Sequence, residues 1–150
     1  MTPQLCSDWY GPLPPGVWLA EPKIDGVRAL VTVAPDGSVS VASREALPLA
    51  GCDAILAEVA SLHLTPCTID GELYAGSFEQ PLSVINGGFG NPIFHVFDII
   101  QAGDEWMALF LRKERLAASI PSSSIHLRLV QWSLVYAREV DDTMRRRSGG

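Results

Sequence analysis

Residues 21–28 read Glu-Pro-Lys-Ile-Asp-Gly-Val-Arg, and this octet lies between two segments that predict strands. It offers a primary amine at Lys23, a carboxylate at Asp25 and a guanidinium at Arg28. In an extended segment Lys23 and Asp25 point to the same side, and Gly26 lets the backbone bend so that Arg28 turns toward the same pocket. Desolvation or nearby cations make a lysine nucleophilic. The octet therefore predicts a reactive amine on a short connection between strands.

The segments around the octet predict strands, a hairpin and then a helix. Residues 17–21 predict a short buried strand, and residues 27–34 and 38–43 predict two strands joined around Asp36-Gly37, which is typical of a hairpin. Residues 48–62 change to a helical period. The apolar residues that recur at spacings of three and four are Leu49, Cys52, Ile55, Leu56, Val59 and Leu62.

The rest of the chain continues the alternation of strands and helices. In chain order we predict a strand at 67–74, a Gly-rich loop at 86–90, strands at 93–100 and 106–111, a helix at 112–119, a strand at 125–136 and a helix at 137–147. Hairpin-linked strands with flanking helices predict an α+β fold with mainly antiparallel sheets.

Composition limits the classes of protein that the chain can represent. Its 150 residues suffice for one domain, and 47% hydrophobic residues argue against disorder. No apolar run reaches the roughly 18 residues of a membrane span, and the first residues do not resemble a signal peptide. Cys6, Cys52 and Cys67 fit buried reduced thiols, so we expect a cytoplasmic protein. The net charge of −6 argues against strong DNA binding through the overall field.

Two later segments add carboxylates and an aromatic ring. In Asp70-Gly71-Glu72-Leu73 the period of a strand puts both acids on one face, although Asp-Gly is also common in solvated turns. In Phe94-His95-Val96-Phe97-Asp98 the same period puts His95 and Phe97 on one face, where both are also compatible with a structural role. Two carboxylates on one face suit Mg²⁺, which prefers oxygen ligands.

The octet resembles motif I, K-x-D-G-x-R, of the nucleotidyltransferase superfamily of ATP-dependent DNA ligases and mRNA capping enzymes. This resemblance implies that Lys23 is the catalytic nucleophile, which attacks the α-phosphate of ATP and keeps AMP as a phosphoramidate. It also implies that Arg28 contacts the nucleotide and that Glu21 helps to read the adenine.

Two further motifs follow in the family's order, and a pair of residues between the first motif and these matches in part. Residues 70–73 resemble motif III, D-G-E-L, which implies that Glu72 contacts the ribose and that Glu72 and Asp70 help to hold Mg²⁺. Residues 94–98 resemble motif IIIa, which implies that Phe97 stacks on the purine. Ser43-Arg44 matches a pair that ligases follow with any residue and then Gly, and it implies a phosphate contact for Arg44. Ala46 stands where that Gly is expected.

The resemblance covers about residues 17–100 and implies an ATP-grasp-like nucleotidyltransferase domain that is incomplete. Residues 1–150 are expected to form the N-terminal part of a ligase adenylation domain. An E-G-x-x-x-K-like motif IV, the two lysines of motif V and the oligonucleotide-binding barrel are absent. We expect a truncated chain, an interrupted reading frame or one half of a split enzyme with a complementary C-terminal fragment.

The resemblance implies an ATP-dependent DNA ligase that uses ATP and Mg²⁺ and seals nicked double-stranded DNA in repair, replication and recombination. Nicked DNA is expected to bind through the missing C-terminal parts, so this piece alone should ligate weakly or not at all. An mRNA-capping guanylyltransferase that uses GTP is one alternative. A non-catalytic remnant of the fold is another.

Overall fold

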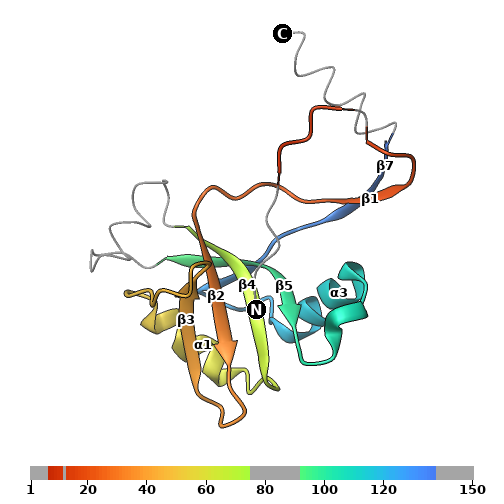
Figure 1. The fold of residues 1–150 in the computed structure, drawn as a ribbon. Helices are drawn as coiled ribbons and strands as arrows, with labels where there is room; N and C mark the ends of the chain where they lie inside the picture. The colour runs from red at the N-terminus through yellow and green to blue at the C-terminus, as the bar shows by residue number, and fades with distance from the viewer. Residues whose placement is uncertain (1–6, 12, 75–91, 138–150) are drawn as a thin grey trace. The chain divides into compact units, whose positions relative to one another are not determined.

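A computed structural model of the chain describes residues 7–11, 13–74 and 92–137. The chain divides into two units, one of residues 1–2 and 23–130 and the other of residues 3–22 and 131–150. Figure 1 colours the chain from its N-terminus to its C-terminus and labels most of its helices and strands. Each unit is described by itself.

The larger unit is built on a five-stranded sheet with the order β3-β2-β4-β5-β6. The contacts β2–β3, β2–β4 and β4–β5 are antiparallel, and β5–β6 is parallel. This confirms the predicted α+β fold with mainly antiparallel sheets. The strands are β2 (Val27–Val33), β3 (Val39–Ser43), β4 (Cys67–Tyr74), β5 (Ile93–Ile100) and β6 (Leu127–Leu129).

The predicted hairpin around Asp36-Gly37 is confirmed as the β2–β3 connection. Gly37 has a φ of 82°, a left-handed conformation that favours glycine. Its backbone N–H donates to the Ala34 carbonyl at 2.9 Å, and the Asp36 carboxylate accepts from the Ser38 N–H at 2.9 Å. The local sequence therefore dictates this turn.

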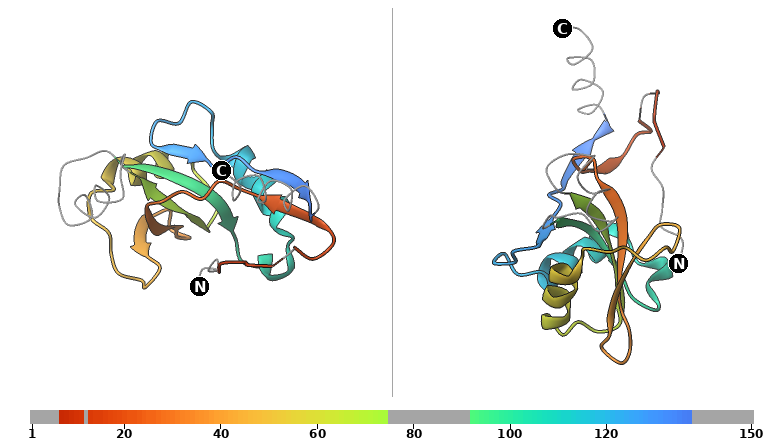
Figure 2. Two further views of the ribbon diagram at one scale, coloured as in Figure 1. Left: turned by 90° about the horizontal axis from the view of Figure 1, so that it is seen from above. Right: turned by 90° about the vertical axis from the view of Figure 1, so that its left-hand side faces the viewer.

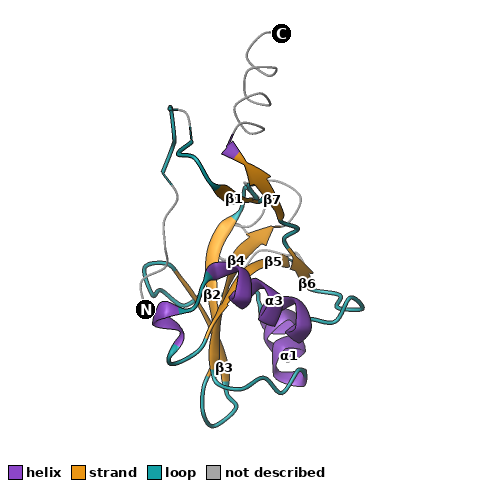
Figure 3. Ribbon diagram, turned by 90° about the vertical axis from the view of Figure 1, so that its right-hand side faces the viewer, coloured by secondary structure: helices purple, strands orange, loops and turns teal. Residues whose placement is uncertain are grey.

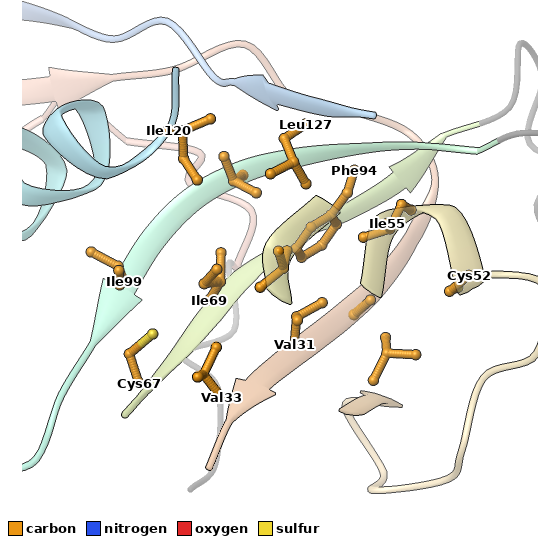
Figure 4. Packing of buried hydrophobic residues seen from close by; sticks show 14 of the residues in the cluster. Val31, Val33, Cys52, Ile55, Cys67, Ile69, Phe94, Ile99, Ile120 and Leu127 are labelled. Carbon is orange, nitrogen blue, oxygen red and sulfur yellow. The ribbon is translucent and has the colours of Figure 1, made fainter. Parts of the chain in front are cut away.

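Two helices, α1 (Asp53–Ser61) and α3 (Leu109–Ser119), cover one face of the sheet. Figure 2 shows α1 on one side of the strands, and Figure 3 shows α3 on that same side. Ile55 and Val59 of α1 and Leu116 of α3 join the sheet's apolar side chains in one core. Figure 4 displays part of this core, in which the largest fully buried side chains are Phe94, Ile55, Ile69, Leu73, Ile99, Leu127, Val31, Val59 and Val96.

The helix predicted at residues 48–62 is present but shorter, as α1 covers only residues 53–61. Gly51 has a φ of 74°, so the chain turns there and α1 begins only at Asp53. The stripe itself is confirmed as core, because Cys52, Ile55 and Val59 are buried and the other members pack against them.

The predicted strand at 106–111 is wrong. A 3-10 turn, η1 (Asp104–Trp106), is followed by α3, which begins at Leu109. A short apolar run does not distinguish a strand from a helix. Here the helix is fixed by Lys113 and Leu116, which are buried at a helical spacing, whereas Leu109, Phe110 and Leu111 of the run are exposed.

The predicted single strand at 125–136 is two strands. β6 ends at Leu129, and β7 (Ser133–Tyr136) belongs to the smaller unit, where it pairs antiparallel with β1 (Val17–Ala20). The prediction that residues 17–21 form a buried strand is wrong about burial. Val17 is 58% exposed and Trp18 is 37% exposed.

Some expectations concern residues at the margins of the description. The Gly-rich loop at 86–90, Cys6 and all but the first residue of the predicted helix at 137–147 lie outside the described residues. Cys52 and Cys67 are free and buried, as expected. Within the described ranges, no helix is long and apolar enough to span a bilayer.

Candidate functional site

The candidate site lies on the face of the five-stranded sheet that points away from the core. On β2, Ala29 and Val31 are fully buried in the core, so Arg28 points to the opposite face. On β4, Ile69 and Leu73 point into the core. Asp70 and Glu72 consequently share the face of Arg28, and Arg28 is the cross-strand partner of Glu72.

Gly26 ties the connection before β2 closely to β4. A Cβ atom at this position would lie 2.1 Å from the Leu73 carbonyl oxygen, so only glycine fits. The Gly26 N–H donates to the Glu72 carboxylate at 3.2 Å. Close approach to β4 therefore explains this glycine, rather than the backbone bend that the sequence suggested.

Gly71 also reflects close packing. A Cβ atom there would lie 2.5 Å from the His95 carbonyl oxygen and 2.6 Å from a ring carbon of Phe94. Phe94 is fully buried, so glycine lets the central aromatic ring of the core lie against β4. The glycine between Asp70 and Glu72 belongs to the core side of the strand, whereas the two acids belong to the site.

Arg28 is the centre of the site. Its Nε and Nη2 donate to the two carboxylate oxygens of Asp70 at 2.6 and 2.7 Å, a bidentate pair whose side chains are 20% and 6% exposed. Its Cζ lies 4.4 Å from the centre of the Phe97 ring, within cation–π distance. Arg28, Asp70 and Phe97, from three separate segments, are thus in direct contact.

A β-bulge in β5 lies at Phe97, which strand alternation from the buried Phe94 and Val96 already puts on the face of the site. The β4–β5 pairing passes from Gly71–Val96 to Asp70–Asp98, which leaves Phe97 as an extra residue. A bulge re-aims side chains and shifts the alternation that follows it. The bulge therefore leaves Phe97 on the face of the site and returns Ile99 to the core, at 1% exposure.

Burial has the largest effect on the pKa values of the two acids of the site, Asp70 and Glu72. Desolvation raises the pKa of Asp70, against the hydrogen bonds and charge of Arg28, which lower it. Desolvation also raises the pKa of Glu72, and the Gly26 N–H and the charges of Arg28 and Lys23 lower it in part. The positive charge of Lys23 is thus felt at Glu72.

Lys23 forms an ion pair with Asp25, in agreement with the prediction that both point to one side. Its side chain is 85% exposed. The desolvation that activates a lysine is therefore absent from this arrangement, and any activation depends on what a bound ligand brings.

Asp70 and Glu72, the expected Mg²⁺ ligands, differ in how many of their carboxylate oxygens accept hydrogen bonds from the protein. Asp70 gives both carboxylate oxygens to Arg28, whereas Glu72 accepts from the Gly26 N–H through one oxygen. In the part of the chain that the structure describes, no three His, Cys, Asp or Glu side chains are grouped to hold a metal ion. These residues do not fit a magnesium site built from protein side chains alone.

Two further residues, Arg44 and Glu21, are predicted to contact the nucleotide. Arg44 pairs with its neighbour Glu45 at 2.5 Å, and its side chain is 57% exposed at the end of β3. Glu21 is an exposed residue that follows β1 in the smaller unit. The nucleotide contacts implied for both stay predictions.

Sequence reasoning missed two residues of α3 that bind β5 at Phe97 and Asp98. Arg112 binds Asp98 through Nε and Nη2, both at 2.9 Å, and Lys113 Nζ donates to the Phe97 carbonyl oxygen at 2.6 Å. The available signal was a lysine within the apolar spacing of α3. His95, expected to be structural, makes an edge contact with the Tyr74 ring at 5.9 Å between centroids, and burial lowers its pKa.

Comparisons with known proteins find no match by sequence but several similar solved structures. No protein-family model matches the chain, and the search of curated proteins gives no significant match. Among solved structures, one described as Pmar-Lig_Pre. has a TM-score of 0.75 at 18% identity, over 87% of this chain and 34% of that one. The ATP-dependent DNA ligase from bacteriophage T7, in complex with ATP, has a TM-score of 0.68 at 14% identity, over 85% and 52%.

A third solved structure, the Chlorella virus DNA ligase-adenylate, has a TM-score of 0.55 at 20% identity, over 79% of this chain and 44% of that one. This chain therefore spans about a third to a half of the length of these structures. At these identities the likeness concerns architecture. The chain has the fold of the nucleotidyltransferase domain of ATP-dependent DNA ligases.

Proposed function

We propose that this chain is the nucleotide-binding part of an ATP-dependent DNA ligase, in which Lys23 receives AMP from ATP. The observation that supports the proposal is the contact of Arg28 with both Asp70 and Phe97, on the face where Glu72 holds Gly26. Residues from three segments that resemble ligase motifs thus surround one position. The fold shared with DNA ligases is consistent with this proposal.

The proposed reaction is a nucleotidyl transfer to an amine. The deprotonated Nζ of Lys23 attacks the α-phosphorus of ATP, an N–P bond forms, and the bond to the departing pyrophosphate oxygen breaks. The products are lysyl-AMP and pyrophosphate, and the amine's proton goes to solvent, to which Lys23 is open. ATP is supplied with Mg²⁺, but no step is assigned to a metal held by the protein.

The surrounding residues bind and orient the nucleotide. The Phe97 ring offers a face for the purine, and base stacking of this kind is worth about 1–3 kcal/mol. Arg28, held by Asp70, supplies a fixed positive charge for the nucleotide, and the Glu72 carboxylate can accept hydrogen bonds from ribose hydroxyls. Glu21 and Arg44 are proposed as further contacts to the nucleotide.

DNA is proposed as the acceptor of AMP, but its binding surface lies mainly outside this chain. The net charge is −6, and the sequence contains only two lysines, Lys23 and Lys113. Binding to DNA phosphates depends on lysine and arginine. We therefore expect little sealing of nicked DNA by this chain alone, and a complementary C-terminal polypeptide is a proposed partner.

The decisive experiment incubates the chain with Mg²⁺ and ATP labelled at the α-phosphate and locates AMP by mass spectrometry. We expect label on Lys23 and none in the Lys23→Ala variant. Lys113 is an internal control, because it is the other lysine and is only 3% exposed. Label on Lys113, or equal labelling of the alanine variant, would contradict the proposal. Competition by unlabelled GTP as effective as that by ATP would favour a capping guanylyltransferase.

A non-catalytic remnant is the second candidate. One observation favours it, namely that the Lys23 side chain is 85% exposed and paired with Asp25. Calorimetry with ATP and with a non-hydrolysable ATP analogue separates the two candidates. Binding of both nucleotides without any transfer of AMP would indicate a remnant that retains the purine site.

A further inference from the structure

Lys113 is a charged residue in an apolar position. It lies on the face of α3 that carries Leu116 and Ile120, and it is 3% exposed. Burying an ammonium group is costly unless hydrogen bonds or charges compensate for the lost water. Its Nζ donates to the Phe97 carbonyl oxygen at 2.6 Å, so the compensation includes the backbone of β5.

The accepting carbonyl belongs to the extra residue of the bulge. Because the ladder is interrupted at Phe97, its peptide group needs hydrogen-bond partners from outside the strand pair. Lys113 supplies one from the side of α3. The next residue of β5, Asp98, is bound by the preceding residue of α3, Arg112, at 2.9 Å. Two consecutive helical side chains thus hold two consecutive residues of the bulge.

The other side of the bulge carries the Phe97 ring. Arg28 lies over this ring at 4.4 Å, and Asp70 holds Arg28 through two hydrogen bonds. The ring's position therefore depends on backbone geometry that α3 fixes from the opposite face of the sheet. A shift of the Phe97 carbonyl would move the ring relative to Arg28.

We propose that Lys113 is a positioning residue that holds the Phe97 ring in place for purine stacking. The inference rests on the proposed function, since it deepens the role given to Phe97. Lys113 does not contact the nucleotide in this proposal. It acts by fixing the bulge, and Arg112 acts with it through Asp98.

The first test measures the ring geometry without any nucleotide. In ¹⁵N-labelled protein, the Arg28 Nε–H proton is shielded by the Phe97 ring current, and the Phe97→Ala variant gives its unshielded position. We expect Lys113→Met to shift this resonance toward that of Phe97→Ala. Arg115→Met is the matched control, because it removes another charged anchor of α3, to Asp104, and should leave the resonance unchanged.

The second test measures ATP dependence of Lys23 labelling. We expect Lys113→Met to raise the half-saturating ATP concentration by about fivefold, which corresponds to the lower end of the free energy of stacking one base. The maximal rate should stay within about twofold. In the Phe97→Ala background, Lys113→Met should add less than about twofold. A merely structural lysine would give the same increase in both backgrounds.

A folded Lys113→Met variant with an unmoved Arg28 resonance would overturn the proposal, as would additivity with Phe97→Ala. If Lys113→Met does not fold, Lys113→Gln replaces it, since the shorter amide does not reach the carbonyl. If the unaltered chain takes no label, the proposed function fails. The resonance then still decides whether Lys113 holds the ring.

Discussion

Ala46 adopts a left-handed backbone conformation, with a φ of 62°, in the turn after β3. This conformation costs a non-glycine residue roughly 1–2 kcal/mol. Ala46→Gly is therefore expected to raise the free energy of unfolding by about 0.5–1 kcal/mol, after the added freedom of the unfolded chain is counted. Urea denaturation followed by circular dichroism measures the change.

The matched control is the same substitution in a regular helix. Ala57 is an exposed residue of α1, where Ala→Gly lowers stability by about 1 kcal/mol. The two variants should change stability in opposite directions. If Ala46→Gly is as destabilising as Ala57→Gly, the turn does not require a left-handed residue. Ala46 occupies the place where the ligase pattern has glycine. The backbone there has the left-handed conformation that glycine favours, although the residue is alanine.

Gly26 makes the second prediction at this scale. A methyl group there would meet the Leu73 carbonyl oxygen at 2.1 Å, so Gly26→Ala must displace the connection from β4. Overpacking costs about 1–3 kcal/mol, and we expect a loss in that range by urea denaturation. Gly11→Ala is the control, since its nearest contacts are at 3.8 Å and its change should stay within about 0.5 kcal/mol. Equal stability of the two variants would mean that the close approach is wrong.

The residues of the candidate site were predictable one by one, but their contacts were not. Strand alternation correctly put Asp70 and Glu72 on one face. The pairing of Arg28 with Asp70 depends on the register of β2 against β4, which brings together residues 42 positions apart. Alternation also puts Phe97 on the face opposite Phe94 and Val96, but the return of Ile99 to the core depends on a bulge, which single-sequence patterns do not encode.

At the scale of elements, α3 is fixed to the sheet by an apolar anchor. Leu116 is 2% exposed and belongs to the core, whereas Leu111 of the same helix is 43% exposed. Leu116→Ala should lower the free energy of unfolding by about 3 kcal/mol because it leaves a cavity. Leu111→Ala, the matched control, should change it by less than about 0.5 kcal/mol. Similar losses in the two variants would contradict the observed packing of α3.

An ion pair anchors the middle of α3 to η1. Arg115 Nη1 donates to the Asp104 carboxylate at 2.5 Å, and this hydrogen bond lowers the pKa of Asp104. A lowered pKa contributes stability above the unfolded value of about 3.9, which is lost as pH falls through the folded pKa. Asp104→Asn should therefore cost about 2 kcal/mol at pH 7, and the difference should shrink below about pH 4.

Urea denaturation of both proteins from pH 3 to pH 7 measures this difference. Glu105→Gln, an exposed neighbouring change, is the control and should have an effect within about 0.5 kcal/mol. A difference that stays constant down to pH 3 would show that the Asp104 charge does not stabilise the fold.

Elements with a clear period were predictable, and those without one were not. The strands at 67–74 and 93–100 are confirmed, and residues 93–100 are rich in the β-branched and aromatic residues that favour strands. The predicted strand at 106–111 is wrong because three apolar residues in a row, at Leu109–Leu111, do not distinguish a strand from a helix. Only its continuation into Lys113 and Leu116 identifies the helix.

At the scale of the molecule, the two units differ in the size of their sheets. The larger unit has five strands and a core shared with two helices, so its backbone hydrogen bonds are protected from solvent. The described part of the smaller unit has two strands of four residues each, β1 and β7. A two-stranded sheet is at best marginally stable.

Hydrogen exchange followed by mass spectrometry tests this difference. Amides of β1 and β7 should exchange at least about 100-fold faster than those of β2 and β4, because local opening of a small sheet costs less free energy than opening of a large one. The edge strand β3 is the internal control. If β3 exchanges as fast as β1, edge position rather than sheet size explains the rates, and if β1 is protected like β2, the smaller unit is stabilised beyond its own two strands.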